Sequence, residues 1–227
     1  MTSVLTVAML IYRKDIAIER RSKETLFTVL SFGLLATLVF ALSFFIENDV
    51  SGAYAPGVIW TVVLFASTLG LQRLFESERE NDCFGGLLLA PIDLKGVYVG
   101  KLLVQLTFSG LMEACTIPLI FLFFDLFPFM DAGRLWTLLL LLALGTLGFA
   151  IIGTLFAAML LSTRLREVLL PIVVYPLVTP VLIAGVQGTR LLFTGTESVS
   201  HWITLIGAFD LIYLGLALAI FPKMLRA

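Results

Sequence analysis

Two acidic residues stand inside long apolar runs of this sequence. Glu113 lies near the middle of the run 102–124, and Asp210 lies near the middle of the run 202–222. A charge at the centre of a bilayer costs several kcal/mol, so carboxyl groups at such positions are candidates for function. They could line a polar path or hold a proton. The alternative is that each is neutral or hydrogen-bonded to a neighbouring helix.

The longest polar segment, residues 73–82, mixes acidic and basic side chains and is bordered by apolar ones. Its candidate contact residues are Arg73, Phe75, Glu76, Glu78, Arg79, Glu80 and Asp82. A short amphipathic helix of this kind can dock into a cleft of another protein. The alternative is a solvated loop between two helices.

Three prolines, Pro171, Pro176 and Pro180, fall within the apolar run 168–186. Each removes an N–H that a helix would use, so we expect this helix to be kinked or broken. Broken helices mark transport sites in some membrane proteins. Other helices merely bend to fit a neighbour.

The single histidine, His201, is a candidate ligand of haem iron, because one axial histidine holds haem in several proteins. A lone histidine at a membrane interface is more often solvated. The sequence has no Cys-x-x-Cys or His-Glu-x-x-His pattern. We therefore expect no catalytic residue, no metal site and no directly bound cofactor.

The segment Gly96–Lys101 resembles a phosphate loop but has three residues between its glycines, and Leu102 stands where a Ser or Thr is needed. Gly96 and Gly100 instead have the small-xxx-small spacing that lets two helices approach closely.

The elements that carry these residues are apolar and long. Of 227 residues, 59% are hydrophobic and 14% are charged, whereas soluble domains have roughly 45–50% and about 25%. Six runs reach the length of about 20 residues that a membrane-spanning helix needs. They are residues 25–46, 53–72, 102–124, 135–161, 168–186 and 202–222. The composition predicts an all-α, polytopic membrane protein with one domain over residues 1–227 and excludes a nucleic-acid binder.

The basic residues between these runs predict the orientation. Thirteen of the 15 Lys and Arg fall on one side if all six runs cross the membrane. Since positive charge marks the cytoplasmic side, we expect both termini, and the loop 73–96, to be cytoplasmic. Residues 4–19 are expected to form an amphipathic helix in the cytoplasmic interface.

Several short segments resemble ABC-2-like exporter permeases, and more closely the B subunits of the haem exporter of cytochrome c maturation. They are Ala55-Pro-Gly-Val-Ile-Trp60, Leu71-x-Arg73-Leu-Phe75, Leu89-x-Pro91, Gly100-Lys101, Thr146-Leu-Gly-Phe149 with Gly153, and Leu169-Leu-Pro171 followed by Tyr175-Pro-Leu-Val-Thr-Pro180. The resemblance runs from about residue 5 to the last apolar run and includes an N-terminal elbow helix.

The resemblance implies a bacterial inner-membrane permease with haem as substrate and ATP used only by a partner subunit. Its implied partners are an ABC ATPase, a second copy of itself, other membrane subunits of cytochrome c maturation, a haem chaperone and membrane lipid. The segment 76–82 would be the helix that couples to the ATPase. Where the family has Gly-Ser or Gly-Thr followed by Leu-Glu, this chain has Cys83-Phe-Gly-Gly86. Because glycine disfavours helix by about 1 kcal/mol, we expect the coupling helix to end near Asp82.

Two other functions remain open from the residues alone. One is a related permease for a lipid, a drug or a polysaccharide. The other is a proton-coupled secondary carrier that uses Glu113 and Asp210 and needs no ATPase.

Overall fold

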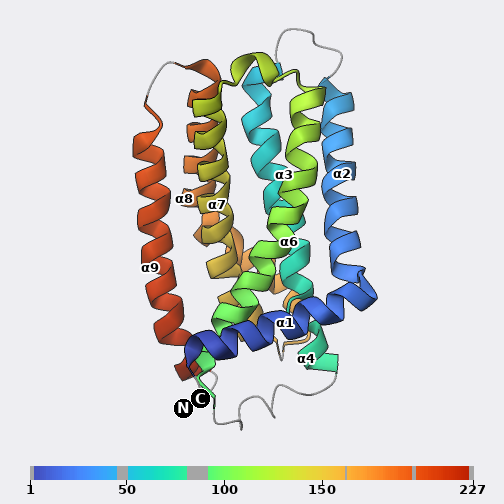
Figure 1. Ribbon diagram of the computed structural model, residues 1–227, viewed down its shortest axis with the longest axis vertical. Helices are drawn as coiled ribbons and strands as arrows, with labels where there is room; N and C mark the ends of the chain where they lie inside the picture. Colours follow the sequence, from blue (N-terminus) through green and yellow to red (C-terminus); the bar gives the residue numbers. More distant parts are fainter. Residues whose placement is uncertain (1–2, 45–50, 81–91, 162, 196–197, 225–227) are drawn as a thin grey trace.

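The computed structural model describes residues 3–44, 51–80, 92–161, 163–195 and 198–224. Within these ranges every regular element is a helix, which confirms the all-α expectation (Figure 1). The elements are α1 (Val4–Ser22), α2 (Glu24–Phe44), α3 (Ser51–Arg73), α4 (Glu76–Glu80), α6 (Leu94–Phe123), the 3-10 helix η1 (Phe127–Phe129), α7 (Ala132–Met159), α8 (Arg166–Thr194) and α9 (Ser200–Met224).

Six of these helices, α2, α3, α6, α7, α8 and α9, are long and apolar enough to cross a membrane. They confirm the six-span prediction and form an upright bundle (Figure 1). Helix α6 has 30 residues, so it is about 45 Å long and exceeds the hydrocarbon core of about 30 Å. It begins at Leu94 rather than at the expected residue 102, because Lys101 is buried inside the protein and does not interrupt the helix.

Helix α1 crosses the end of the bundle at a steep angle to the other helices (Figure 1). Ser3 caps its first turn by accepting a hydrogen bond from the N–H of Thr6. It ends at Lys23, which has a left-handed backbone with φ of 60°. The carboxylate of Glu19 accepts from the N–H of Leu26 at 2.7 Å and so ties the elbow to the start of α2. The sequence therefore forms the expected elbow, although the helix continues to Ser22.

Gly96 and Gly100 let α1 lie directly on α6. A Cβ atom at Gly96 would stand 2.7 Å from the carbonyl oxygen of Val4, and one at Gly100 would stand 2.8 Å from that of Ala8. Both distances are closer than side chains tolerate. The small-xxx-small spacing thus serves the contact between the elbow and α6.

Trp60 fills the centre of the bundle between α3, α7 and α8. A Cβ at either Gly145 or Gly185 would lie less than 3.0 Å from its ring. Its indole N–H donates to the hydroxyl of Thr189 at 3.0 Å, so the one polar atom of the ring is satisfied.

The proline-rich run, which we expected to be kinked or broken, forms one unbroken helix, α8. Pro171 cannot donate to the carbonyl of Glu167 one turn earlier. The side chain of Gln72 on α3 donates to that carbonyl at 3.1 Å instead. Neighbouring helices can replace backbone hydrogen bonds in this way. A kink at Pro171, Pro176 and Pro180 stays a prediction.

Candidate functional site at the elbow junction

The structure brings four charged residues together where α1, α4 and α6 meet. We call Lys14, Asp15, Glu78 and Lys101 the lysine cluster. Lys101 on α6 is only 1% exposed. Its ammonium group lies 2.6 Å from a carboxylate oxygen of Glu78 and 2.8 Å from one of Asp15.

Lys101 donates two hydrogen bonds and forms an additional ion pair with Asp15. Besides the two carboxylates, the ammonium group donates to the carbonyl of Leu74 at 2.8 Å, at the junction of α3 and α4. It also lies over the ring of Phe75, 4.8 Å from the ring centre, where the aromatic face attracts a cation. A buried lysine is tolerated when its charge and donors are satisfied in this manner.

A second lysine, on helix α1, also contacts Glu78. Lys14 on α1 pairs with the other carboxylate oxygen of Glu78 and, at 3.1 Å, with its neighbour Asp15. Burial alone would lower the pKa of Lys14, but the hydrogen bond to Glu78 and the nearby negative charges outweigh it and raise the pKa. Glu78 is therefore held by one lysine from α1 and one from α6. This arrangement joins the elbow, α4 and α6 into one unit.

The predicted contact residues of the segment 73–82 divide into two sets. Phe75 and Glu78 are buried, at 1% and 5% exposure, so they anchor α4 to the bundle. Arg79 is exposed and Glu76 is half-buried. Arg73 pairs with Glu24 at 3.4 Å and with Glu76 at 3.8 Å.

The last two predicted contact residues of the segment 73–82 are Glu80 and Asp82. The side chain of Glu80, and all of Asp82, lie outside the described residues, as does the predicted end of the helix near Asp82. Docking of this segment on a partner stays a prediction.

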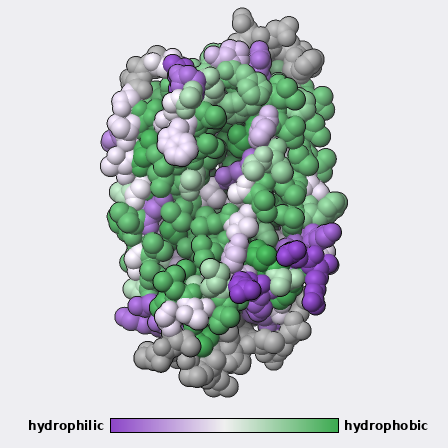
Figure 2. Space-filling model, in the orientation of Figure 1, coloured by the Kyte–Doolittle hydropathy of each residue, from purple (hydrophilic) through white to green (hydrophobic). Residues whose placement is uncertain are grey.

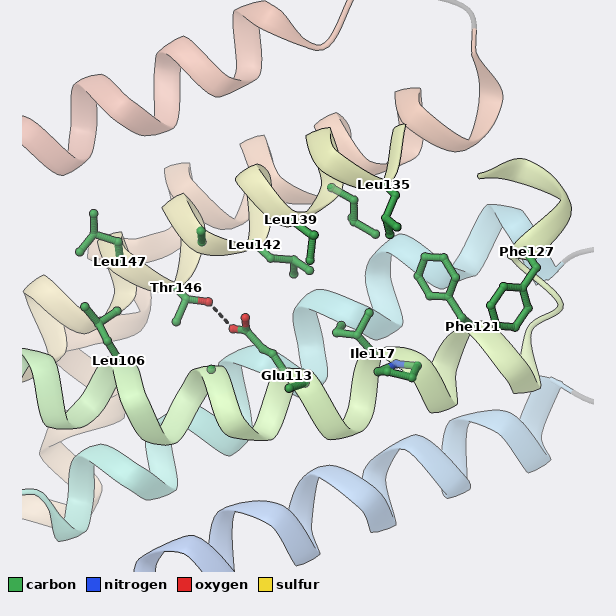
Figure 3. A pocket seen from close by; sticks show the side chains of 15 residues that line it. Leu106, Glu113, Ile117, Phe121, Phe127, Leu135, Leu139, Leu142, Thr146 and Leu147 are labelled. Carbon is green, nitrogen blue, oxygen red and sulfur yellow. Dashed lines mark hydrogen bonds between the residues drawn. The ribbon is translucent and has the colours of Figure 1, made fainter. Parts of the chain in front are cut away.

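Glu113 lies in a cavity of about 770 Å³ between α6 and α7 (Figure 3). Its carboxylate accepts a hydrogen bond from the hydroxyl of Thr146 on α7. The remaining lining is almost entirely apolar and includes Leu106, Ile117, Phe121, Leu139 and Leu142. The cavity therefore combines an apolar wall with one hydrogen-bonded carboxyl group.

Asp210 lies on the other side of α7 and does not meet Glu113. It is 4% exposed, and neither carboxylate oxygen has a hydrogen-bond partner among the described residues. It packs against Gly148, where a Cβ would lie less than 3.0 Å from the carboxylate. Because Thr146 and Gly148 are two positions apart on α7, they face different neighbours. The two carboxyl groups are therefore held by different faces of one helix.

The predicted haem ligand, His201, stands apart from both the lysine cluster and the cavity at Glu113. His201 is exposed at the start of α9, and its ring contacts the ring of Trp202. Among the described residues no group of three His, Cys, Asp or Glu side chains is placed to hold a metal ion.

Of the four residues in the lysine cluster, only Glu78 is a site residue predicted from the sequence. Lys101 enters there only through the glycine-rich segment and the resemblance, and Lys14 and Asp15 are not singled out. A signal was present, because Lys101 follows Gly100 at the start of an apolar run and Asp15 interrupts an amphipathic helix.

Comparison with known proteins identifies the family. The family model described as CcmB protein matches residues 6–227. The heme exporter protein B of Pseudomonas aeruginosa is 29% identical over 214 residues, which cover 93% of this chain and 94% of that protein. The protein of the same name from Paracoccus denitrificans is 27% identical, with 90% and 91% covered. That from Haemophilus influenzae is 28% identical, with 76% of each covered. This chain, with its six apolar helices and elbow, belongs to the CcmB protein family.

Proposed function

We propose that this chain is the membrane permease subunit of an ABC-type haem exporter that serves cytochrome c maturation. The match to the CcmB family over residues 6–227 carries the proposal. It is supported by curated relatives named heme exporter protein B and by six helices suited to a membrane. The sequence has no nucleotide-binding motif, so we assign ATP hydrolysis to a partner subunit and no catalysis to this chain.

The outward side of α4 is the proposed contact with the ATPase. Glu76 and Arg79 are accessible, whereas Phe75 and Glu78 fix the helix from behind. A displacement of α4 acts directly on Lys101, since Glu78 and the carbonyl of Leu74 both bind its ammonium group. Lys101 lies on α6, which also carries Glu113 and one wall of the cavity. The lysine cluster thus connects an ATPase on the cytoplasmic side to the centre of the membrane.

The proposed assembly lies in the inner membrane of a bacterium with both termini in the cytoplasm. It contains the ATPase, a second copy of this chain, other membrane subunits of the pathway and a haem chaperone outside the cytoplasm. ATP reaches the assembly only through the ATPase. Haem is its substrate and not a resident cofactor of this chain.

The direct test is to purify the chain from its host in mild detergent and identify the subunits that accompany it. We expect an ABC ATPase and a haem absorbance band. A photo-crosslinking residue at position 79 should capture the ATPase, whereas the same residue at the exposed position 223 of α9 should not. Recovery of the chain without any ATPase, or equal crosslinking from both positions, would contradict the proposal.

A second experiment decides how haem is handled. Leu139 lines the cavity and its neighbour Leu140 does not, although both are exposed on α7. If haem enters the cavity from the membrane, Leu139→Trp should reduce haem delivery while Leu140→Trp should not. If the subunit only drives release of a haem-loaded chaperone, both variants should deliver haem normally.

A further inference from the structure

We propose that α1 and its C-terminal cap bind anionic phospholipid headgroups of the cytoplasmic leaflet through Arg13, Arg20, Arg21 and Lys23. All four residues are exposed. Within the described part of the chain none of them forms an ion pair, in contrast to Lys14, Lys101 and Arg73.

Two contacts define how α1 is rotated about its axis. The hydroxyl of Tyr12 is hydrogen-bonded to that of Thr107 at 3.2 Å. Thr107 lies almost two turns further along α6 than Lys101, which is toward the membrane centre. Lys14, two residues after Tyr12, points instead to Glu78 on α4. The side of α1 that carries Tyr12 therefore faces the membrane, and the side that carries Lys14 faces the cytoplasm.

An apolar stripe follows the membrane side of α1. Leu5, Met9, Tyr12 and Ile16 are spaced by four, three and four residues, which places them on one helical face. Leu5 is 80% exposed and Met9 is 53% exposed, so the protein leaves the N-terminal half of this stripe uncovered, whereas Tyr12 and Ile16 pack partly against the core. A helix with such a stripe lies at the boundary between headgroups and acyl chains.

Two of the basic residues, Arg13 and Arg20, lie beside this stripe, at the height of the headgroups. Arg13 and Arg20 are seven residues apart, so they project from the same face, about 10 Å from each other. Arg21 is seven residues after Lys14 and projects from the cytoplasmic side of α1, and Lys23 caps the C-terminal end of the helix. Figure 2 shows hydrophilic residues gathered over the end of α1 near α2, below a largely hydrophobic surface. Cations in the last turn also stabilise the helix dipole, but Arg13 stands in mid-helix, where that effect is absent.

An anionic phospholipid fits both the basic residues and the apolar stripe of α1. Basic residues on an amphipathic helix attract acidic headgroups, and the apolar stripe beside them inserts among acyl chains. An acidic protein would leave the stripe uncovered. Lipid bound here would also hold the elbow in place, and the elbow contacts α4 through Lys14 and α6 through Asp15.

The test uses the full chain in nanodiscs made from equal parts of phosphatidylcholine and phosphatidylglycerol. A variant with Arg13, Arg20, Arg21 and Lys23 all changed to Gln is compared with a control of equal charge change. In the control, Arg79, Lys95, Arg164 and Lys223 are changed to Gln; these residues are exposed and lie at the same end of the bundle. The lipids that stay bound are counted by native mass spectrometry, and thermal unfolding confirms that both variants are folded.

We expect the affinity of the α1 variant for phosphatidylglycerol to fall roughly fivefold for each cation removed at low salt, so that fewer phosphatidylglycerol molecules stay bound while phosphatidylcholine changes little. The control should lose much less. Equal loss in both variants would overturn the proposal. So would unchanged binding of phosphatidylglycerol in the α1 variant. The assay needs neither haem nor ATP, so its outcome is separate from that of the proposed function.

Discussion

Removing the positive charge of Lys101 should destabilise the protein strongly. In Lys101→Met the methionine roughly fills the space of the lysine stem, but Asp15 and Glu78 lose their shared cation. Both carboxylates keep Lys14, but that lysine is 43% exposed, so Lys101 is the buried cation they share; Glu78 is 5% exposed and the Asp15 side chain is 10% exposed. Breaking a buried ion pair by removing one partner typically costs about 3–5 kcal/mol, because a charge is left buried without compensation. We expect a loss in this range in the free energy of unfolding.

A second variant separates the charge effect from packing. When Asp15→Asn and Glu78→Gln are added to Lys101→Met, no uncompensated acid remains at the cluster. Replacement of a whole buried ionic group is often nearly neutral in stability, so most of the loss should be recovered. Reversible unfolding in mixed detergent micelles measures both variants. The exposed Lys95, on the same helix, provides the control Lys95→Met.

Two results would refute this reasoning. If Lys101→Met lost less than about 1 kcal/mol, the ammonium group would not be buried against two carboxylates. If the triple variant were as unstable as the single one, the loss would come from packing of the side chain and not from its charge.

Three further outcomes follow from the packing and hydrogen bonds of the bundle. Gly100→Leu should separate α1 from α6, since a Cβ there already meets backbone of α1; faster protease cleavage of the elbow reports this. Gly145→Ala should cost about 1–3 kcal/mol by overpacking, whereas Gly207→Ala, which has open space, should not destabilise the fold in the same unfolding assay. Thr146→Val should cost about 1–3 kcal/mol because it removes the donor to Glu113; an unfolding midpoint equal to that of the parent would contradict the contact.

The apolar runs could be read from the sequence because a bilayer imposes a minimum length and composition on each spanning helix. The elbow could be read because its apolar residues recur with helical spacing. The lysine cluster could not be, since Asp15 and Lys101 are far apart along the chain and their pairing depends on how α1 lies on α6.

Two other features also depended on tertiary contacts. Helix α8 stays unbroken because Gln72 from α3 donates to the carbonyl that Pro171 leaves free. The partner of Glu113 is a threonine on the following helix, which no spacing rule identifies.

The coupling of ATP hydrolysis to haem delivery tests the central claim most directly. The measurement is the amount of haem delivered to the chaperone per ATP hydrolysed, by the complete assembly reconstituted in proteoliposomes. The test variant is Glu76→Lys with Arg79→Glu, which reverses two accessible charges of α4, and the control is Lys223→Glu on α9. We predict that the α4 variant loses haem delivery and its stimulation of the ATPase, while the control retains both. Normal delivery and normal ATPase activity in the α4 variant would contradict the proposed coupling function.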